Sequence, residues 1–186
     1  MDTTSKRYGV LKLHEAFSSV RRPGSHILAT GLAIGSGDLA FAFAFWIPRG
    51  ETPMRILQSI SAGLLGGRSY AGGWATALVG AALHFCIASA FVLAFYLSAR
   101  RYPLLTRHPL VTGSGYGLAL YLVMHLVVLP LSAAGMPSFD DLSWVASSIT
   151  VHVAIGIACC LSARRALSPD STGGMAGPLS ARRRAP

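Results

Sequence analysis

Charged residues are scarce in this sequence. They make up 12% of the 186 residues, and only seven are acidic, whereas a typical soluble domain carries about 25% charge. Hydrophobic residues reach 52% and the mean hydropathy is +0.51. The missing charge is concentrated in long apolar segments. This composition excludes an ordinary soluble domain and indicates an integral membrane protein.

Paired cysteines and catalytic signatures are also missing. Cys86, Cys159 and Cys160 lie inside apolar segments and form no CxxC pair, so we expect packing residues and no disulfide framework. The sequence has no nucleophile with an adjacent base, no HExxH motif and no phosphate-binding loop. Asp140 and Asp141 are adjacent acids in a loop, where topology and helix capping explain them better than catalysis. We expect a non-enzymatic protein without a cofactor or metal.

Four apolar segments of about 20 residues are each long enough to cross the hydrocarbon core of a bilayer. They cover residues 27–47, 75–98, 110–131 and 142–161. The first is longer than a typical signal-peptide core, so we expect a retained anchor, with cleavage near Ala42 and Ala44 as the alternative. The sequence therefore predicts an all-α integral membrane bundle of four transmembrane helices within residues 27–165.

A shorter element, residues 53–65, lies between the first two spans. Thr52 can cap its N-terminus, Pro53 suits the first helical position, and Gly66 and Gly67 stop it. Its apolar residues recur at spacings of three and four, as on one face of a helix. Because the element is too short to span, we predict an interfacial helix on the membrane surface or a re-entrant helix.

The distribution of basic residues predicts the orientation. The N-terminal segment, the loop from Arg100 to Arg107 and the chain from Arg164 onward share one side and hold 13 of the 16 basic residues. The positive-inside rule makes this side cytoplasmic. The three tryptophans fall at the outer ends of the spans, as in an aromatic belt. These are Trp46, Trp74 and Trp144.

Two polar segments flank the spans. Residues 1–26 form a basic N-terminal segment, and residues 166–186 are rich in Ser, Pro, Gly and Arg, which predicts a disordered cytoplasmic tail. Residues 182–184 are candidates for contact with anionic lipid head groups, although a solvated tail explains them equally well. The net charge of +9 does not predict nucleic-acid binding, because the basic residues lie between apolar segments as topology determinants do.

Each span carries one ionisable side chain. These are Asp38, His84, His125 and His152. Such residues are costly at membrane depth and usually face the bundle interior or a water-filled cavity. At about 1.5 Å per residue, His125 lies nearer the outer surface and the other three lie near mid-membrane. We predict that the four form a buried polar cluster.

Small residues lie along the same helix faces as these side chains and mark close-packing surfaces. The predicted packing glycines are Gly31, Gly35, Gly80, Gly113, Gly117 and Gly156. The Gly31-x-x-x-Gly35 pattern suits packing within the bundle or between two copies, which leaves a homo-oligomer open. Pro130 is expected to kink or end the third span near His125.

Three interpretations of the polar cluster remain open. The histidines can bond across helices, each bond contributing on the order of 1 kcal/mol, in a structural or assembly subunit. They can form a site that senses or moves protons or a small solute, the interpretation we favour as function. They can also bind metal or haem, but no single helix carries an HxxxH pair, so each ligand would come from a different span.

Three stretches around these histidines resemble a known family. LHFCIASAFVLAFY in the second span, YLVMHLVVLPLSA in the third and SSITVHVAIG in the fourth resemble the YagU-like bacterial inner-membrane proteins. The resemblance covers roughly residues 29–165, and Asp38 matches no fixed acidic position in it. It implies a four-span protein of a bacterial inner membrane, and no reaction or substrate class.

Overall fold

The computed structural model describes residues 23–136 and 139–168, and within them every regular element is helical. The long helices are α2 (Pro23–Trp46), α4 (Gly73–Arg101), α5 (Pro109–Val123) and α7 (Leu142–Ala166). The shorter helices are α3 (Pro53–Leu65) and α6 (Leu129–Leu131), and a π-helical segment, η4 (Met124–Val128), joins α5 to α6. Three 3-10 turns complete the chain: η1 (Ile47–Arg49), η2 (Gly66–Ala71) and η3 (Pro103–Thr106). The predicted all-α class is confirmed.

Four of these stretches are long and apolar enough to cross a membrane. They are residues Gly24–Arg49, Gly73–Arg101, Pro109–Leu131 and Leu142–Ala166. Large apolar side chains such as Leu78, Leu110 and Val111 remain exposed on the outside of the bundle. A soluble protein of this size rarely exposes so much contiguous apolar surface. The protein is therefore a membrane-embedded bundle whose outer surface suits lipid.

The helices continue beyond the apolar segments that the sequence marks. Residues 23–26, expected in the polar N-terminal segment, form the first turn of α2, because Pro23 suits the first helical position. Arg100, Arg101, Arg164 and Arg165 lie in the last turns of α4 and α7, where positive charge favours the helix C-terminus. The remainder of the predicted tails, with the candidate lipid-contacting residues 182–184, lies outside the described residues.

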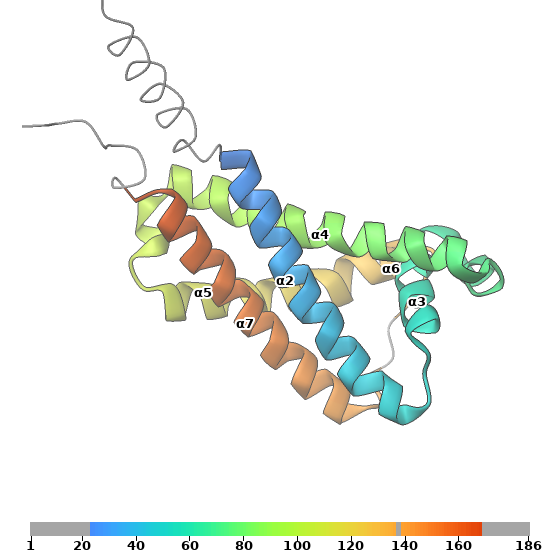
Figure 1. Cartoon of the computed structure of the whole chain (residues 1–186). Coiled ribbons are helices and arrows are strands. Elements are labelled where there is room, and N and C mark those ends of the chain that lie inside the picture. Colours follow the sequence, from blue (N-terminus) through green and yellow to red (C-terminus); the bar gives the residue numbers. More distant parts are fainter. Residues whose placement is uncertain (1–22, 137–138, 169–186) are drawn as a thin grey trace, which may run out of the picture.

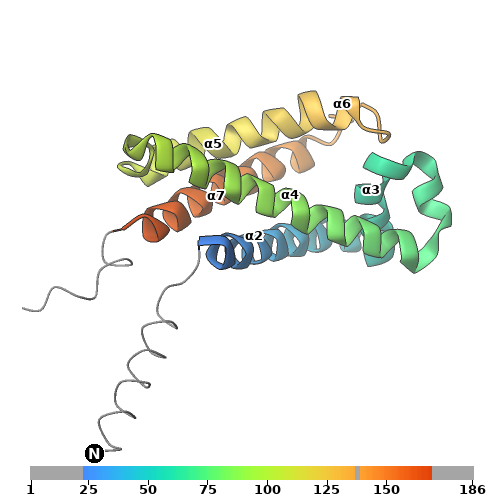
Figure 2. The same cartoon turned by 90° about the horizontal axis from the view of Figure 1, so that it is seen from above.

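The four long helices form two crossing pairs, α5 with α7 and α2 with α4 (Figure 1). Helix α7 contacts α2, α4 and α5, and the bundle is most compact towards residues 23 and 168 (Figure 1). Towards the other end, α2 and α7 separate from α4 and α6, and α3 lies beside the gap that they leave (Figures 1 and 2). The bundle therefore has a packed half and a splayed half.

Glycines allow the α5–α7 pair to meet backbone to backbone. A Cβ added to Gly117 would collide with the carbonyl of His152, and one added to Gly156 would collide with the backbone of Gly113 and Gly117. At Gly113 the obstructing group is the backbone of Ile157. Such contacts are typical of membrane helices, where small residues permit close van der Waals packing.

The other three predicted packing glycines lie in the contacts of α4. A Cβ on Gly31 would meet Ser89, and a Cβ on Gly35 would meet Phe85 at 2.8 Å. Gly80 faces the backbone of Leu57 in α3 at a distance that no Cβ could occupy. At all six positions, an added Cβ would therefore lie less than 3.0 Å from an atom of a neighbouring helix.

Helix α3 has the bounds that its sequence signals indicate. The Thr52 side chain accepts a hydrogen bond from the Arg55 amide, and the helix ends at Gly66, whose φ of +58° favours glycine. Gln58 is buried and donates to the carbonyl of Gly73 at the start of α4. Helix α3 is also held by a backbone bond from Ala133, after α6, to the Gly63 carbonyl.

The hydrophobic core lies in the packed half. Val92, Phe95, Tyr96 and Ala99 of α4 pack against three residues of α7 and are almost fully buried. The three α7 residues are Cys159, Cys160 and Ala163. Two of the cysteines are therefore packing residues, as expected, and the third, Cys86, is exposed on α4.

Candidate functional site

A cavity of about 680 Å³ occupies the splayed half of the bundle. Its walls come from the C-terminal half of α2, from α3 and η2, from the middle of α4, from η4 and α6, and from α7. Most of the lining is apolar. The four predicted site residues, Asp38, His84, His125 and His152, all contribute to it, each from a different helical segment.

An aromatic group covers one side of the cavity where α2 meets the start of α7. The rings of Phe41 and Trp144 stack with centroids 5.6 Å apart, and Trp46 lies 5.2 Å from Trp144. Phe45 contacts both indoles. Trp74 stands apart from this group, exposed at the start of α4. All three tryptophans thus lie at the end of the bundle away from residues 23 and 168.

Asp38 and His84 form the first polar pair. The Asp38 Oδ2 atom lies 4.0 Å from His84 Nε2, and that nitrogen also donates to the Gly35 carbonyl of α2 at 2.8 Å. The absence of a side chain at Gly35 lets α4 come close enough for this bond. His84 therefore connects α4 to α2, and its side chain and that of Asp38 are 14% and 30% exposed.

His125 and His152 form the second pair, with Tyr121 beside them. The two imidazole centroids are 6.2 Å apart. Tyr121 stacks on His125 at 4.1 Å and meets His152 edge-on at 5.5 Å. Each histidine is bonded to its own helix, because Nδ1 of His125 donates to the Tyr121 carbonyl and Nδ1 of His152 to the Ser148 carbonyl. Neither bond connects two helices.

The backbone bonds determine the tautomer of all three neutral imidazoles. A carbonyl oxygen only accepts hydrogen bonds, so the ring nitrogen that contacts it must carry the hydrogen. The hydrogen is therefore on Nε2 of His84 and on Nδ1 of His125 and His152. The other ring nitrogen of each histidine has an unshared electron pair, which can accept a hydrogen bond or a proton.

A wide helical turn displaces His125. Residues Met124–Val128 are π-helical, and the amide of Leu129 bonds to the carbonyl of Met124. Pro130, in α6, has no amide hydrogen for the carbonyl four residues earlier, and the wider turn accommodates this loss. The expected helix disturbance before Pro130 is thus a π-turn that contains His125, a feature common at functional sites.

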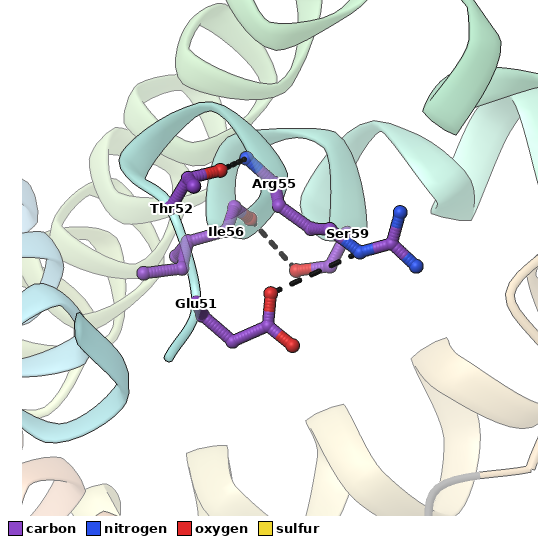
Figure 3. Close-up of polar contacts among 5 residues, drawn as sticks. All are labelled: Glu51, Thr52, Arg55, Ile56 and Ser59. Carbon is purple, nitrogen blue, oxygen red and sulfur yellow. Dashed lines mark hydrogen bonds and ion pairs between the residues drawn. The ribbon is translucent and has the colours of Figure 1, made fainter. Parts of the chain in front are cut away.

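Helix α3 contributes charged groups at one edge of the cavity. Arg55 Nε lies 3.8 Å from Glu51 Oε2, one turn earlier, and the guanidinium lies 4.5 Å from the centre of the Tyr70 ring. Figure 3 shows the two charged side chains meeting beside Ser59, whose hydroxyl donates to the Ile56 carbonyl. Glu51, Arg55, Ser59 and Tyr70 all line the cavity.

The four predicted residues share one cavity but do not form one buried cluster. They divide into the pairs Asp38–His84 and His125–His152, and each of the four residues is partly exposed because it borders open space. Within residues 23–136 and 139–168, no group of three or more His, Cys, Asp or Glu side chains is arranged to hold a metal ion.

Some contacts of the site escaped the sequence reasoning. Tyr121 lies one turn before His125, a spacing that indicates contact on a helix, but its second contact with His152 depends on the α5–α7 packing. Glu51 and Arg55 have the spacing of a helical ion pair, but spacing alone does not place that pair at a cavity.

A further polar contact joins α2 to α7 in the packed half. His26 Nε2 lies 3.0 Å from the Ser162 hydroxyl, which also bonds to the Thr30 hydroxyl at 2.9 Å. None of these three residues lines the cavity.

Comparisons with protein-family models, curated proteins and solved structures found no match to the chain.

Proposed function

We propose that this chain is a non-enzymatic, multi-pass membrane protein that binds a small, largely apolar solute and responds to protons at the same place. One observation carries the proposal: Asp38, His84, His125 and His152 come from four helical segments and all border a single cavity. Ligand sites are typically apolar concavities with a few convergent polar groups.

The cavity suits a solute of moderate size. At about 680 Å³ it falls within the range of about 300 to 1,000 Å³ typical of small-molecule pockets. Aromatic rings from α2 and α7 form part of its wall, and they offer large contact areas at little entropic cost. The polar pairs are placed to orient the solute.

The histidines supply the response to protons. Histidine is the side chain whose charge ordinarily changes between pH 5 and 8. Each of the three imidazoles donates its N–H to a backbone carbonyl, which leaves one nitrogen per ring that can accept a proton. Protonation therefore adds charge to the wall of the cavity.

We further propose the membrane and the orientation. The basic end of the chain, with residues 23 and 168, lies in the cytoplasm of a bacterial inner membrane, where the positive-inside rule places it. The cavity then lies in the outer half of the bilayer. The YagU-like resemblance agrees with this location and stays a prediction.

A structural or assembly role is the second candidate, and one contact favours it. The bond from His84 to the Gly35 carbonyl holds α4 to α2, as expected of a histidine that serves packing. His125 and His152 make no such cross-helix bond. A structural role thus explains one of the three histidines.

The test measures binding of three probes to the purified protein in lipid nanodiscs at pH 8. The probes are the cation tetraphenylphosphonium, the anion tetraphenylborate and neutral N-phenyl-1-naphthylamine. Equilibrium dialysis against empty nanodiscs corrects for partition into lipid. Ala42→Trp fills the cavity from its α2 wall, whereas Ala40→Trp adds the same bulk to an exposed position outside it.

We expect at least one probe to bind the wild type and the Ala40→Trp variant in a saturable manner, and to lose that binding in Ala42→Trp. Saturable binding that survives in Ala42→Trp would place the site elsewhere. If none of the three probes binds the wild type, the proposed solute site is wrong and the structural role remains as the candidate function.

A further inference from the structure

We propose that the cavity selects solutes that carry a positive charge on an apolar body, such as lipophilic organic cations, and that protons compete with them. This inference rests on the proposed function, because it names the chemical class of solute for the same cavity. Two features carry it: the balance of charges around the cavity and the direction of its hydrogen-bonding groups.

The charged and titratable groups that border the cavity come from most of the elements around it. They are Asp38 on α2, Glu51 before α3, Arg55 on α3, Tyr70 on η2, His84 on α4, His125 on η4 and His152 on α7. Arg55 is paired with Glu51 and lies over the Tyr70 ring. With neutral imidazoles, the carboxylate of Asp38 is therefore left as the uncompensated charge, and the cavity is negative.

Several polar groups that line the cavity are placed to accept hydrogen bonds. The free ring nitrogens of the three neutral histidines and the Asp38 carboxylate are acceptors. The hydroxyls of Ser59 and Ser132 give their hydrogens to the backbone carbonyls of Ile56 and Leu129. A solute with N–H donors and a positive charge satisfies such a wall, whereas an anion meets the carboxylate of Asp38.

The aromatic wall adds to the same preference. Phe41, Trp46, Phe91 and Trp144 all border the cavity. The faces of aromatic rings carry partial negative charge and attract cations, most strongly where water is excluded. An apolar cation gains both this attraction and the burial of its hydrocarbon surface.

Protonation of the imidazoles reverses this balance. Each protonated histidine adds one positive charge near the solute, and the three together outweigh the single negative charge of Asp38. Because histidines ordinarily titrate between pH 5 and 8, the affinity for a cation should fall as the pH falls through this range. Binding of a cation should correspondingly displace protons from the cavity.

The experiment compares tetraphenylphosphonium with tetraphenylborate, two ions of matched shape and opposite charge that do not titrate between pH 5 and 8. Saturable binding to the wild type and to two variants in nanodiscs is measured at pH 8 and at pH 5. Asp38→Asn removes the charge from the cavity with little change of shape. Asp140→Asn makes the same chemical change in the loop before α7, outside the cavity lining.

We expect the phosphonium to bind the wild type at pH 8 at least about tenfold more tightly than the borate, and to lose about tenfold or more in affinity at pH 5. Asp38→Asn should weaken phosphonium binding by about tenfold, and Asp140→Asn should leave it unchanged. The charge comparison and the pH comparison use the wild type, so they hold even if Asp38→Asn fails to fold.

The possible contrary results differ in what they overturn. Equal or tighter binding of the borate, lost in Ala42→Trp, refutes the cationic class and leaves the proposed solute site intact. Phosphonium binding that is the same at pH 8 and pH 5 refutes the competition with protons. Failure of all probes to bind refutes the proposed function together with this inference.

Discussion

The packed half and the splayed half of the bundle are built from the same long apolar helices, but one half encloses a buried core and the other a cavity. In the packed half, Phe95 of α4 is 2% exposed and is surrounded by residues of α7 and α5. In the splayed half, α4 instead presents His84 and Phe91 to a cavity. The comparison shows that helix length and hydropathy place the protein in the membrane, whereas crossing angles and small residues decide where space is left.

The largest expected effect is the loss of stability when an aromatic side chain of α4 is truncated, and it should differ between the two halves. Phe95→Ala removes a buried ring from the core and should lower the free energy of unfolding by about 3 kcal/mol or more. Phe91→Ala removes a ring that borders the cavity and should cost clearly less, because one side of this ring already faces open space. Thermal unfolding in detergent compares the two variants. Equal decreases in stability would contradict the division into halves.

The next effect tests the close approach of α5 and α7. Gly117→Ala puts a Cβ against the His152 carbonyl, and overpacking of this kind costs about 1 to 3 kcal/mol. Gly115→Ala, two residues earlier, meets nothing within 4 Å and should be neutral or stabilising, because alanine favours helix over glycine. The unfolding temperatures of both variants, compared with that of the wild type, test this packing. A destabilised Gly115→Ala with a tolerated Gly117→Ala would refute the packing.

A smaller effect distinguishes the two polar pairs. His84→Ala removes a cross-helix hydrogen bond and should cost on the order of 1 kcal/mol. His152→Ala removes a bond within its own helix and should cost less, although both variants should lose the pH dependence of solute binding in part. Unfolding and probe binding, measured on the same preparations, separate stability from function. Larger destabilisation by His152→Ala would favour the structural role.

The smallest effect concerns the start of α7. The hydroxyl of Ser143 and the amides of Trp144 and Ser143 donate to Asp141, and these bonds lower the pKa of its carboxyl below the ordinary value. The cap therefore contributes stability above the ordinary pKa of aspartate and loses it as the pH falls through the lowered pKa. The protection of the first-turn amides of α7 against hydrogen exchange, relative to their intrinsic exchange rate at each pH, should fall below that pH, and Asp141→Asn should remove this dependence. An unchanged profile in the variant would show that Asp141 is not the cause.

Local features of the structure could be predicted from the sequence. The bounds of α3 follow from Thr52, Pro53 and Gly66, because capping and chain reversal depend on neighbouring residues. The length of the apolar segments predicts the four spans but not their ends, because the helices continue past those segments into polar residues, where hydropathy gives no signal. His26 shows this limit, since it belongs to α2 and bonds to α7.

The site could be predicted only as a set of residues. Depth along each span placed Asp38, His84 and His152 near mid-membrane and His125 at an overlapping depth nearer the outer surface, which is a property of each helix alone. Their division into two pairs depends on how α2 crosses α4 and how α5 crosses α7, which no single segment determines. The cavity itself has the same origin, because it results from the separation of the helices beyond their glycine contacts.

The most direct measurement of the central claim uses chemical access to the cavity wall. Ile87 borders the cavity, whereas the neighbouring Cys86 is exposed on the outer surface of α4 and is absent from the lining. In nanodiscs, a small cationic thiol reagent should modify Ile87→Cys, made in a Cys86→Ala background, much faster than it modifies Cys86 in the wild type, because lipid covers Cys86. Phosphonium should slow the reaction at Ile87→Cys. Equal rates at the two positions, or no protection by any probe that binds, would contradict the assignment of a solute cavity to this part of the bundle.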